Sequence, residues 1–398
     1  MTRPILYLDI SRLMRRFENF GGPTGIDRVD IAYAHWAATQ DDFEPAAVTR
    51  VRGGLLALPA EAFATVIAEL DRRWQTDAPP GFGREDRSLV RYGAERAAGR
   101  LRRWRLLSRA TRPDPAGRPS VYLNASQDGL DEPQNYAALP GARAALIHDV
   151  IPLTHPEYDT PRATLLHQRR VAALAAHFDH VITNSEATRR DLLAASPDTV
   201  RFEAATAHLG PAMEPATLPA VFQAPTFVHL STINRRKNLA FLLHIWRDLA
   251  ALPDPPRLAI IGRRGNDGTA LELIDRCAAL QGLVTMHGAL SDREAAAVIA
   301  GARALLTPSF AEGFGLPIVE AHLMGVPVIA SDLPAHREVG GEAAQYRAPL
   351  DGPGWQEAIL ALTHDDAHHA ACRAAIRPPA TWDQHFATVA PRLRAIAR

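Results

Sequence analysis

The sequence of 398 residues has only two cysteines, Cys277 and Cys372, and its 44 basic residues are balanced by 44 acidic ones. Two cysteines are too few for a disulfide framework or a zinc site, which favours a reducing, cytoplasmic setting. Balanced charge provides no overall field for nucleic acid, so we expect no nucleic-acid partner. Long apolar runs are also missing. Asp9 interrupts the first one, so we expect a strand there rather than a signal peptide or a membrane span.

The length predicts about two domains, and short apolar runs that alternate with helical patterns are typical of α/β architecture. In the first domain we expect strands at Ile5–Ile10, Val121–Ala125, Ala145–His148 and Val181–Thr183, and a helix at Ala163–Phe178. Strands at Phe227–Leu230, Leu258–Ile261, Val284–His287, Ala304–Leu306 and Val328–Ala330 indicate the second. A proline-rich segment, Pro211–Pro225, separates them. We place the domains at 1–211 and 226–377, with a final helix at 380–398 that packs back on the first.

Residues 302–331 predict a strand, a glycine-containing loop, a helix and a further strand. Gly313 and Gly315 lie in the loop, where they let backbone N–H groups approach a ligand closely. Glu312 and Glu320 are eight residues apart, one in the loop and one in the helix. Carboxylates placed in this way can accept hydrogen bonds from sugar hydroxyls.

A second segment, Phe227–Asn238, predicts a buried strand that runs into three cations, Arg235, Arg236 and Lys237. Cations at the carboxyl end of a parallel strand can neutralise a diphosphate and stabilise the charge that grows as it departs. Asn238 is well placed to cap the helix that follows.

Taken together, Arg236–Asn238, Gly262, His287–Glu294 and Pro308–Ala321 resemble glycosyltransferase family 4 of the GT-B fold. Glu312 and Glu320 match the signature of two glutamates separated by seven residues. The resemblance covers the second domain and extends more weakly into the first. It implies two Rossmann-like domains facing each other across a cleft, and transfer with retention of anomeric configuration.

The resemblance also implies roles for individual residues. Glu320 would hold the ribose hydroxyls of the donor, Glu312 would contact the transferring sugar, and Arg236 and Lys237 would bind the diphosphate. Further donor-binding positions are Ser231, His287, Gly288, Ser309, Phe310, Gly313, Phe314, Gly315 and Leu316. The family often has glycine where this chain has Ser231, which changes how closely the backbone can approach a phosphate.

In the first domain, Gly21–Val29 follows the first strand and opens a helix. Thr24 and Gly25 match the position at which the family presents a glycine loop to the donor phosphates. His148 and Asp149 end a central strand, similar to a pair of the family that faces the cleft, and His148 would help to hold the donor sugar. Ser185 and Glu186 are expected to start a helix near it.

We expect no cofactor and no metal, because the chain contains no Asp-x-Asp pair and the cations near Arg236 would balance the diphosphate instead. The substrates would be a nucleotide-diphosphate sugar and a saccharide or lipid-linked saccharide. Arg84–Arg118 is strongly basic, and within it Arg96–Arg112 suggests peripheral contact with an inner membrane. The alternative is a solvated helix whose apolar residues Leu101, Trp104 and Leu107 pack on its own domain.

The expected activity is that of a hexosyltransferase, for example a mannosyl- or glucosyltransferase, in the synthesis of bacterial surface polysaccharide or glycolipid. Two alternatives keep the fold, namely a nucleotide-sugar epimerase and a phosphorylase-like transferase. A third is a catalytically silent GT-B protein that serves as a scaffold or a sugar-binding module. The intact set of Glu312, Glu320, Arg236 and Lys237 argues against such decay.

Overall fold

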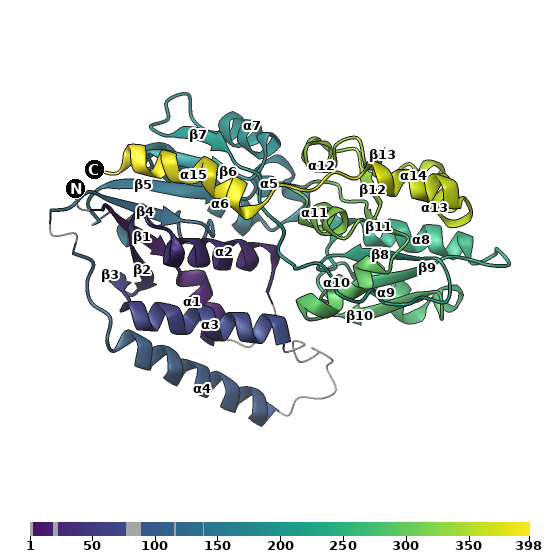
Figure 1. Ribbon diagram of the computed structural model, residues 1–398, viewed down its shortest axis with the longest axis horizontal. Helices are drawn as coiled ribbons and strands as arrows, with labels where there is room; N and C mark the ends of the chain where they lie inside the picture. The colour runs from purple at the N-terminus through teal and green to yellow at the C-terminus, as the bar shows by residue number, and fades with distance from the viewer. Residues whose placement is uncertain (1–2, 19–22, 77–88, 115–116, 138) are drawn as a thin grey trace. The chain divides into compact units, whose positions relative to one another are not determined.

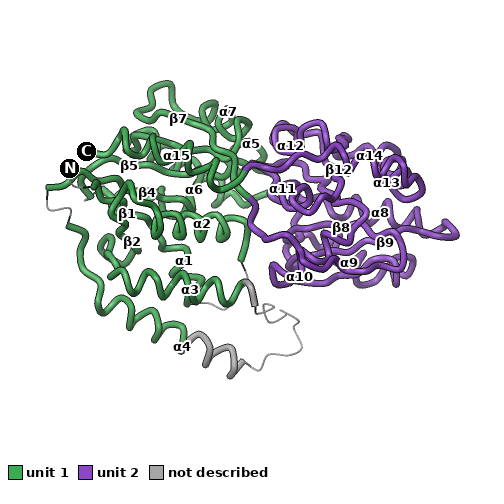
Figure 2. The backbone as a smooth tube through the Cα atoms, viewed as in Figure 1, with its two compact units in different colours: residues 1–79, 83–210, 381–398 green, residues 80–82, 211–380 purple. Residues whose placement is uncertain are grey.

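A computed structural model describes residues 3–18, 23–76, 89–114, 117–137 and 139–398. The chain forms two compact units (Figure 2): unit 1 comprises 1–79, 83–210 and 381–398, and unit 2 comprises 80–82 and 211–380. Gly21 and Gly22 of the predicted glycine loop lie outside the described residues, as do positions 84–88 and 115–116 of the basic stretch.

Unit 1 contains a seven-stranded sheet in the order β3-β2-β1-β4-β5-β6-β7 (Figure 1), in which only the β2–β3 pair is antiparallel. The strands are β1 (Ile5–Asp9), β2 (Glu44–Val51), β3 (Gly54–Ala57), β4 (Ser120–Asn124), β5 (Ala142–Ile147), β6 (His180–Thr183) and β7 (Glu203–Thr206). The four strands predicted for this domain are confirmed, and β2, β3 and β7 are additional.

The helices of unit 1 include the predicted one at 163–178. They are α1 (Ser11–Glu18), α2 (Gly25–Thr39), α3 (Ala60–Thr76), α4 (Leu89–Leu107), α5 (Ile151–Thr154), α6 (Pro161–His177), α7 (Glu186–Ala195) and α15 (Trp382–Ile396). Two short 3-10 turns, Pro133–Asn135 and Pro156–Tyr158, complete the unit. None of the helices in the described parts of the chain has both the length and the apolarity that crossing a bilayer requires.

The last helix, α15, returns to unit 1 and packs against β6. Its His385 is buried, and the ring nitrogens of His385 lie 2.8 Å from the Tyr33 hydroxyl and 3.2 Å from the carbonyl oxygen of Ala207. Phe386 stacks on Trp36 of α2, with ring centroids 4.7 Å apart. Aromatic packing and buried hydrogen bonds therefore attach the end of the chain to unit 1.

Unit 2 contains a six-stranded, fully parallel sheet in the order β10-β9-β8-β11-β12-β13. Its strands are β8 (Thr226–Leu230), β9 (Arg257–Ile261), β10 (Val284–Gly288), β11 (Ala304–Thr307), β12 (Val328–Ser331) and β13 (Gln345–Arg347). The helices are α8 (Leu239–Leu249), α9 (Gly268–Arg276), α10 (Asp292–Ala300), α11 (Leu316–Leu323), α12 (Pro334–Gly340), α13 (Gly352–His364) and α14 (Asp366–Ala375), with 3-10 turns η3 (Arg235–Lys237) and η4 (Ala278–Leu280).

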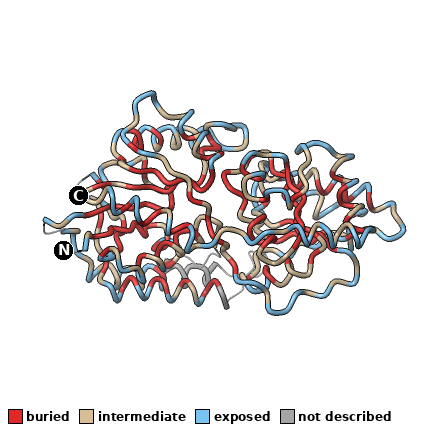
Figure 3. Tube along the Cα trace, turned by 45° about the horizontal axis from the view of Figure 1, so that its top comes forward, coloured by how far each residue is buried: buried red, intermediate tan, exposed pale blue. Residues whose placement is uncertain are grey.

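The central strands of unit 2 are apolar on both sides because helices cover both faces of the sheet. In β9, Leu258 and Ile260 belong to one buried cluster, while Ala259 and Ile261 belong to the other. Alternate side chains of a strand point to opposite faces, so this division follows from the strand geometry. Figure 3 shows buried residues along the strands of both units.

Each sheet has one point at which the chain changes direction across the strand order. In unit 1 it lies between β1 and β4, and in unit 2 between β8 and β11. Ligands of open α/β sheets bind beyond the carboxyl ends of the strands at such points. The residues that follow β1, β4, β8 and β11 are therefore the first candidates for a site.

Candidate active site

In unit 2, two loops meet at the carboxyl ends of the neighbouring parallel strands β8 and β11. The first carries η3, which contains Arg236 and Lys237, and the second contains Ser309–Gly315. A backbone hydrogen bond from Phe310 N to the carbonyl oxygen of Arg236, 2.8 Å long, joins the two loops. Topology thus brings together cations and a carboxylate that are 75 residues apart in the chain.

Glu312 lies at the centre of this cluster. Its carboxylate pairs with Arg236 Nη1 at 2.8 Å, with Lys237 Nζ, and with the hydroxyl of Ser309 at 2.8 Å. Arg236 also donates to the carbonyl oxygen of Ala311. The three charged side chains are 10–21% exposed, so water screens their attraction only in part.

The electrostatics of Glu312 are set by two opposing effects. Burial acts to raise the pKa of its carboxyl group, but the charges of Lys237 and Arg236 outweigh burial and hold the pKa well below its usual value. Glu312 is therefore ionised across the physiological range, and the two cations are held in fixed positions beside it.

His336 of α12 is a buried neighbour of this cluster that the sequence did not indicate. Its Nδ1 lies 2.9 Å from the carbonyl oxygen of Ser331, which can only accept, so Nδ1 carries the proton and Nε2 is an acceptor. Burial lowers the pKa of His336, with a smaller opposing effect from Glu312. No hydrogen-bond partner of Nε2 is found among the described residues.

Ser231 follows β8, and its hydroxyl lies 2.7 Å from Nε2 of the buried His229. Burial lowers the pKa of His229 to about 4. Gly262, with φ of +142°, passes so close to this turn that a Cβ there would lie 1.8 Å from the carbonyl oxygen of Ser231. Glycine is therefore required at this position, and Ser231 is held against the end of β9.

The Gly313–Leu316 segment leads directly into α11. Gly315 has φ of +115° and occupies the N-cap, and a Cβ there would lie 3.3 Å from His336. Because Gly315 has no side chain to act as a cap, the first N–H groups of α11 are not satisfied by the N-cap residue. Gly313 and Phe314 are buried beside them.

The second predicted glutamate, Glu320, is buried within α11. Its Oε1 accepts a hydrogen bond of 2.8 Å from the backbone N–H of Ala212, at the start of the segment between the predicted domains. His287 and Gly288 end the edge strand β10, and β9 separates them from β8.

Asn238 is the N-cap residue of α8, as its position predicted, but it does not cap the helix with its side chain. Asn238 adopts a left-handed conformation with φ of +54°. Its amide nitrogen instead donates to the carbonyl oxygens of Pro308 and Pro349, at 3.1 and 2.9 Å. Asn238 therefore anchors the two loops that border the cluster.

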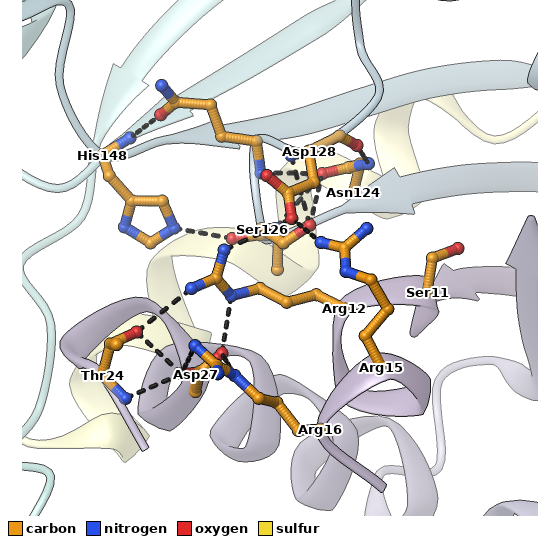
Figure 4. Close-up of polar contacts among 12 residues, drawn as sticks. Ser11, Arg12, Arg15, Arg16, Thr24, Asp27, Asn124, Ser126, Asp128 and His148 are labelled. Carbon is orange, nitrogen blue, oxygen red and sulfur yellow. Dashed lines mark hydrogen bonds and ion pairs between the residues drawn. The ribbon is translucent and has the colours of Figure 1, made fainter. Parts of the chain in front are cut away.

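In unit 1, the predicted loop residues Thr24 and Gly25 form the start of α2. Asp27 accepts hydrogen bonds of 2.7 Å from both the backbone N–H and the hydroxyl of Thr24. Asp27 is fully buried and also pairs with Arg12 and Arg16 of α1, at 2.6 and 2.8 Å. Figure 4 shows Arg12 extended between this loop and Asp128.

Asp128, just beyond β4, forms the second centre of this cluster. It pairs with Arg12 at 3.3 Å, with Arg15, and with Arg170 at 3.6 Å. Burial acts to raise the pKa of Asp27 and of Asp128, but the neighbouring arginines lower both below the usual value. The four arginines that contact Asp27 and Asp128 are thus paired with carboxylates of their own unit.

His148 lies at the end of β5 and is buried. Its Nε2 is 2.8 Å from the carbonyl oxygen of Ala125, and its backbone N–H donates to Gln127 Oε1. Burial lowers the pKa of His148. Ser185 is the N-cap of α7, as predicted, and accepts from Thr188 N at 2.9 Å, while the exposed Glu186 pairs with Arg189.

Sequence reasoning missed Arg12, Asp27, Asp128 and His336. Asp27 left a detectable signal, because Thr24 followed by an acidic residue three positions later is a capping pattern. Arg12 and Asp128 are 116 residues apart and His336 follows no motif, so no local pattern could have joined them to the site.

Two largely parallel α/β sheets are also found together in known proteins of similar structure. The structure is similar over 99% of the chain to sucrose-phosphate synthase from Thermosynechococcus elongatus, with a TM-score of 0.65 at 16% identity and 99% of that chain covered. It is similarly close to HepE from Anabaena, solved with UDP and glucose, with a TM-score of 0.63 at 17% identity over 99% of this chain and all of HepE. The chain therefore has the GT-B fold of two Rossmann-like sheets.

Residues 224–365 match the family described as glycosyl transferases, group 1. The match confirms the resemblance to glycosyltransferase family 4 in this part of the chain. The serotype-specific mannosyltransferase WbdA of Escherichia coli is 29% identical over 247 residues, which cover 56% of this chain and 30% of WbdA. The O-antigen chain mannosyltransferase B of Escherichia coli is 34% identical over 145 residues, or 35% of this chain and 37% of that protein. The chain thus spans about a third of the length of these relatives.

Proposed function

We propose that the protein is a retaining, metal-independent hexosyltransferase. It moves a sugar, mannose foremost, from a nucleotide-diphosphate donor to a saccharide or lipid-linked saccharide. The family match in unit 2 and the similarity to several mannosyltransferases support this reaction class. Two of these relatives carry O-antigen or serotype descriptions, which supports a role in bacterial surface polysaccharide or glycolipid synthesis, in the cytoplasm beside the inner membrane.

The observation that carries the proposal is the Glu312 cluster at the carboxyl ends of β8 and β11. Arg236 and Lys237 supply two cations held in place by a single carboxylate and the hydroxyl of Ser309. A donor diphosphate placed against this pair would meet charge that is already oriented. Such cations stabilise the negative charge that grows on the departing diphosphate without reorganisation during the reaction.

The remaining roles follow the family assignment. Glu312 contacts the transferring sugar, and Glu320 accepts hydrogen bonds from the ribose. The first N–H groups of α11 provide the positive end of a helix for a phosphate. Transfer with retention proceeds by attack on the face from which the diphosphate leaves, with the diphosphate taking the proton of the acceptor hydroxyl. In unit 1, Thr24, Gly25 and His148 keep the donor-binding roles that the family resemblance implies.

A panel of UDP-, GDP-, ADP- and CMP-sugars tests the donor class. The correct donor binds only the folded protein and should raise its melting temperature. Transfer is then measured as release of the nucleoside diphosphate on addition of a saccharide acceptor. Binding without acceptor-dependent release, across a broad acceptor panel, would instead support the catalytically silent alternative.

Metal independence is tested separately. Because Arg236 and Lys237 are proposed to balance the diphosphate, exhaustive EDTA treatment should leave the turnover rate unchanged. A loss of turnover that magnesium or manganese restores would contradict this part of the proposal, while leaving the transfer reaction itself intact.

A further inference from the structure

Helix α4 packs on α1 through one narrow face. At Gly99 the two helices touch so closely that a Cβ would lie 2.0 Å from the carbonyl oxygen of Glu18. On the same side, Arg103 Nη1 pairs with the carboxylate of Glu18 at 2.9 Å, and Arg102 and Leu106 are half-buried. These contacts fix the rotation of α4 about its own axis.

Given this rotation, Leu101 and Trp104 lie on the opposite, outward side of the helix, because each residue of an α-helix advances by about 100°. Leu101 is 49% exposed and Trp104 is 64% exposed. Residues three apart on a helix are neighbours, so the two side chains form a continuous apolar strip. The alternative stated from the sequence, that Leu101, Trp104 and Leu107 pack on their own domain, is therefore wrong for Leu101 and Trp104, whereas Leu107 is half-buried.

The charge around this strip is of one sign. Residues 98–112 contain six arginines and no aspartate or glutamate. Arg100 and Arg105 are exposed on either side of the strip; further along, Arg112 is exposed, and the exposed Arg109 lies 3.7 Å from the carboxylate of Glu61. An outward Trp and Leu flanked by arginines suit the interface of an anionic bilayer, where the apolar groups enter the headgroup region and the cations meet lipid phosphate.

We propose that the outward face of α4, defined by Arg100, Leu101, Trp104 and Arg105, docks the protein on an anionic lipid surface. The apolar strip favours lipid over nucleic acid. A protein surface that binds nucleic acid presents several aromatic rings on which bases stack, and an exposed leucine adds little to such binding. This surface would bring the enzyme to a lipid-linked acceptor. The link to an acceptor rests on the proposed function, whereas the docking itself does not.

Co-sedimentation with vesicles tests the docking directly and needs no donor or acceptor. The wild-type chain should bind vesicles of phosphatidylcholine mixed with phosphatidylglycerol, bind phosphatidylcholine alone much more weakly, and lose affinity as salt rises. An arginine near an anionic surface strengthens binding by roughly fivefold, so Arg100→Glu with Arg105→Glu should weaken it by at least about tenfold. Leu101→Ser with Trp104→Ser should also weaken binding strongly.

The controls carry the same chemical changes on exposed residues elsewhere. Leu350→Ser removes another exposed leucine, and Arg276→Glu with Arg377→Glu reverses two exposed arginines of unit 2. Both should bind vesicles as the wild type does. All variants should keep the wild-type melting temperature and the wild-type affinity for nucleoside diphosphate, which separates loss of docking from loss of the donor site.

Equal binding to neutral and anionic vesicles would overturn the proposal, as would α4 variants that bind like the controls. A short oligonucleotide that displaces the chain from vesicles, and whose own binding is lost in the same α4 variants, would assign this face to nucleic acid instead. A chain that docks but transfers no sugar would refute only the proposed function.

Discussion

Each unit has a cluster of charged side chains at the point of its sheet where the strand order changes direction, but the two clusters differ in their numbers of carboxylates and cations. In unit 2, two cations surround the single carboxylate of Glu312 beyond β8 and β11. In unit 1, beyond β1 and β4, two carboxylates, Asp27 and Asp128, share Arg12 and pair with three further arginines. Both clusters hold more cations than carboxylates, but the fully buried Asp27 ties α1 to the start of α2, whereas Glu312 holds its cations at the carboxyl ends of β8 and β11, the edge at which α/β sheets bind ligands.

Removal of a cation from unit 2 should have the largest effect. Lys237→Ala takes away a preorganised charge at the proposed diphosphate site, and we expect turnover to fall by about 100- to 1,000-fold. Arg235→Ala is the matched control, because this neighbouring cation is exposed and should leave turnover nearly unchanged. Equal effects of the two variants would show that the Glu312 cluster does not balance the diphosphate.

Removal of a charge from unit 1 should instead reduce stability. Asp27→Asn leaves Arg12 and Arg16, which are 15% and 24% exposed, without their shared carboxylate, and should lower the free energy of unfolding by about 3 kcal/mol. Chemical denaturation measures this change, with the exposed Asp41→Asn as the control. A stable Asp27→Asn protein that had lost only nucleotide affinity would place Asp27 at the ligand and remove the contrast between the units.

The two glutamates of unit 2 sharpen the comparison within one unit. Glu320→Ala should weaken binding of the free nucleoside diphosphate by about 1–3 kcal/mol, because it removes charged hydrogen bonds to the ribose. Glu312→Ala should cut turnover, and its effect on the affinity for free diphosphate should be much smaller if it mainly contacts the transferring sugar. Calorimetry separates the two effects. Equal losses of affinity in both variants, or no loss in Glu320→Ala, would show that the roles are wrongly assigned.

The sequence predicted unit 2 better than unit 1 for a physical reason. The central strands of unit 2 are short apolar runs, and Arg236, Lys237 and Glu312 lie in compact segments directly beyond two of them. In unit 1, β2 (Glu44–Val51) includes charged and proline residues, which hide the strand pattern. The three-residue β13, Gln345–Arg347, was missed in unit 2 for the similar reason that it lacks an apolar run.

The pairings themselves were beyond sequence reasoning. Both Arg236 and Lys237 were expected to bind diphosphate, but their joint pairing with Glu312 depends on the strand order β8-β11. His336 reaches the cluster only because α12 follows β12 on the far side of β11. Such contacts are set by the tertiary fold, and one sequence read locally does not contain them.

The smallest effect we predict concerns buried histidines and the pH dependence of stability. Burial lowers the pKa of His322 in α11 to about 4, whereas an unfolded histidine has a pKa of about 6.5. At pH 7 both states are neutral at this position. As the pH falls below about 6.5, the unfolded state takes up a proton that the folded state refuses, so the free energy of unfolding decreases until the pH reaches about 4.

His322→Leu should therefore flatten the decline of stability between pH 6.5 and pH 4, by about 1–2 kcal/mol at pH 5 relative to pH 7. His364→Leu, at an exposed position of the same unit, is the matched control and should keep the wild-type slope. Urea denaturation at pH 7, 6 and 5 measures the slopes. Burial also lowers the pKa of His229 in unit 2 and of His385 in unit 1 to about 4. The free energy of unfolding of His322→Leu should therefore still decrease as the pH falls, but less steeply than that of the wild type. Identical slopes in His322→Leu and the wild type would mean that the pKa of His322 is not lowered in the folded state, which would contradict the expected effect of its burial in α11.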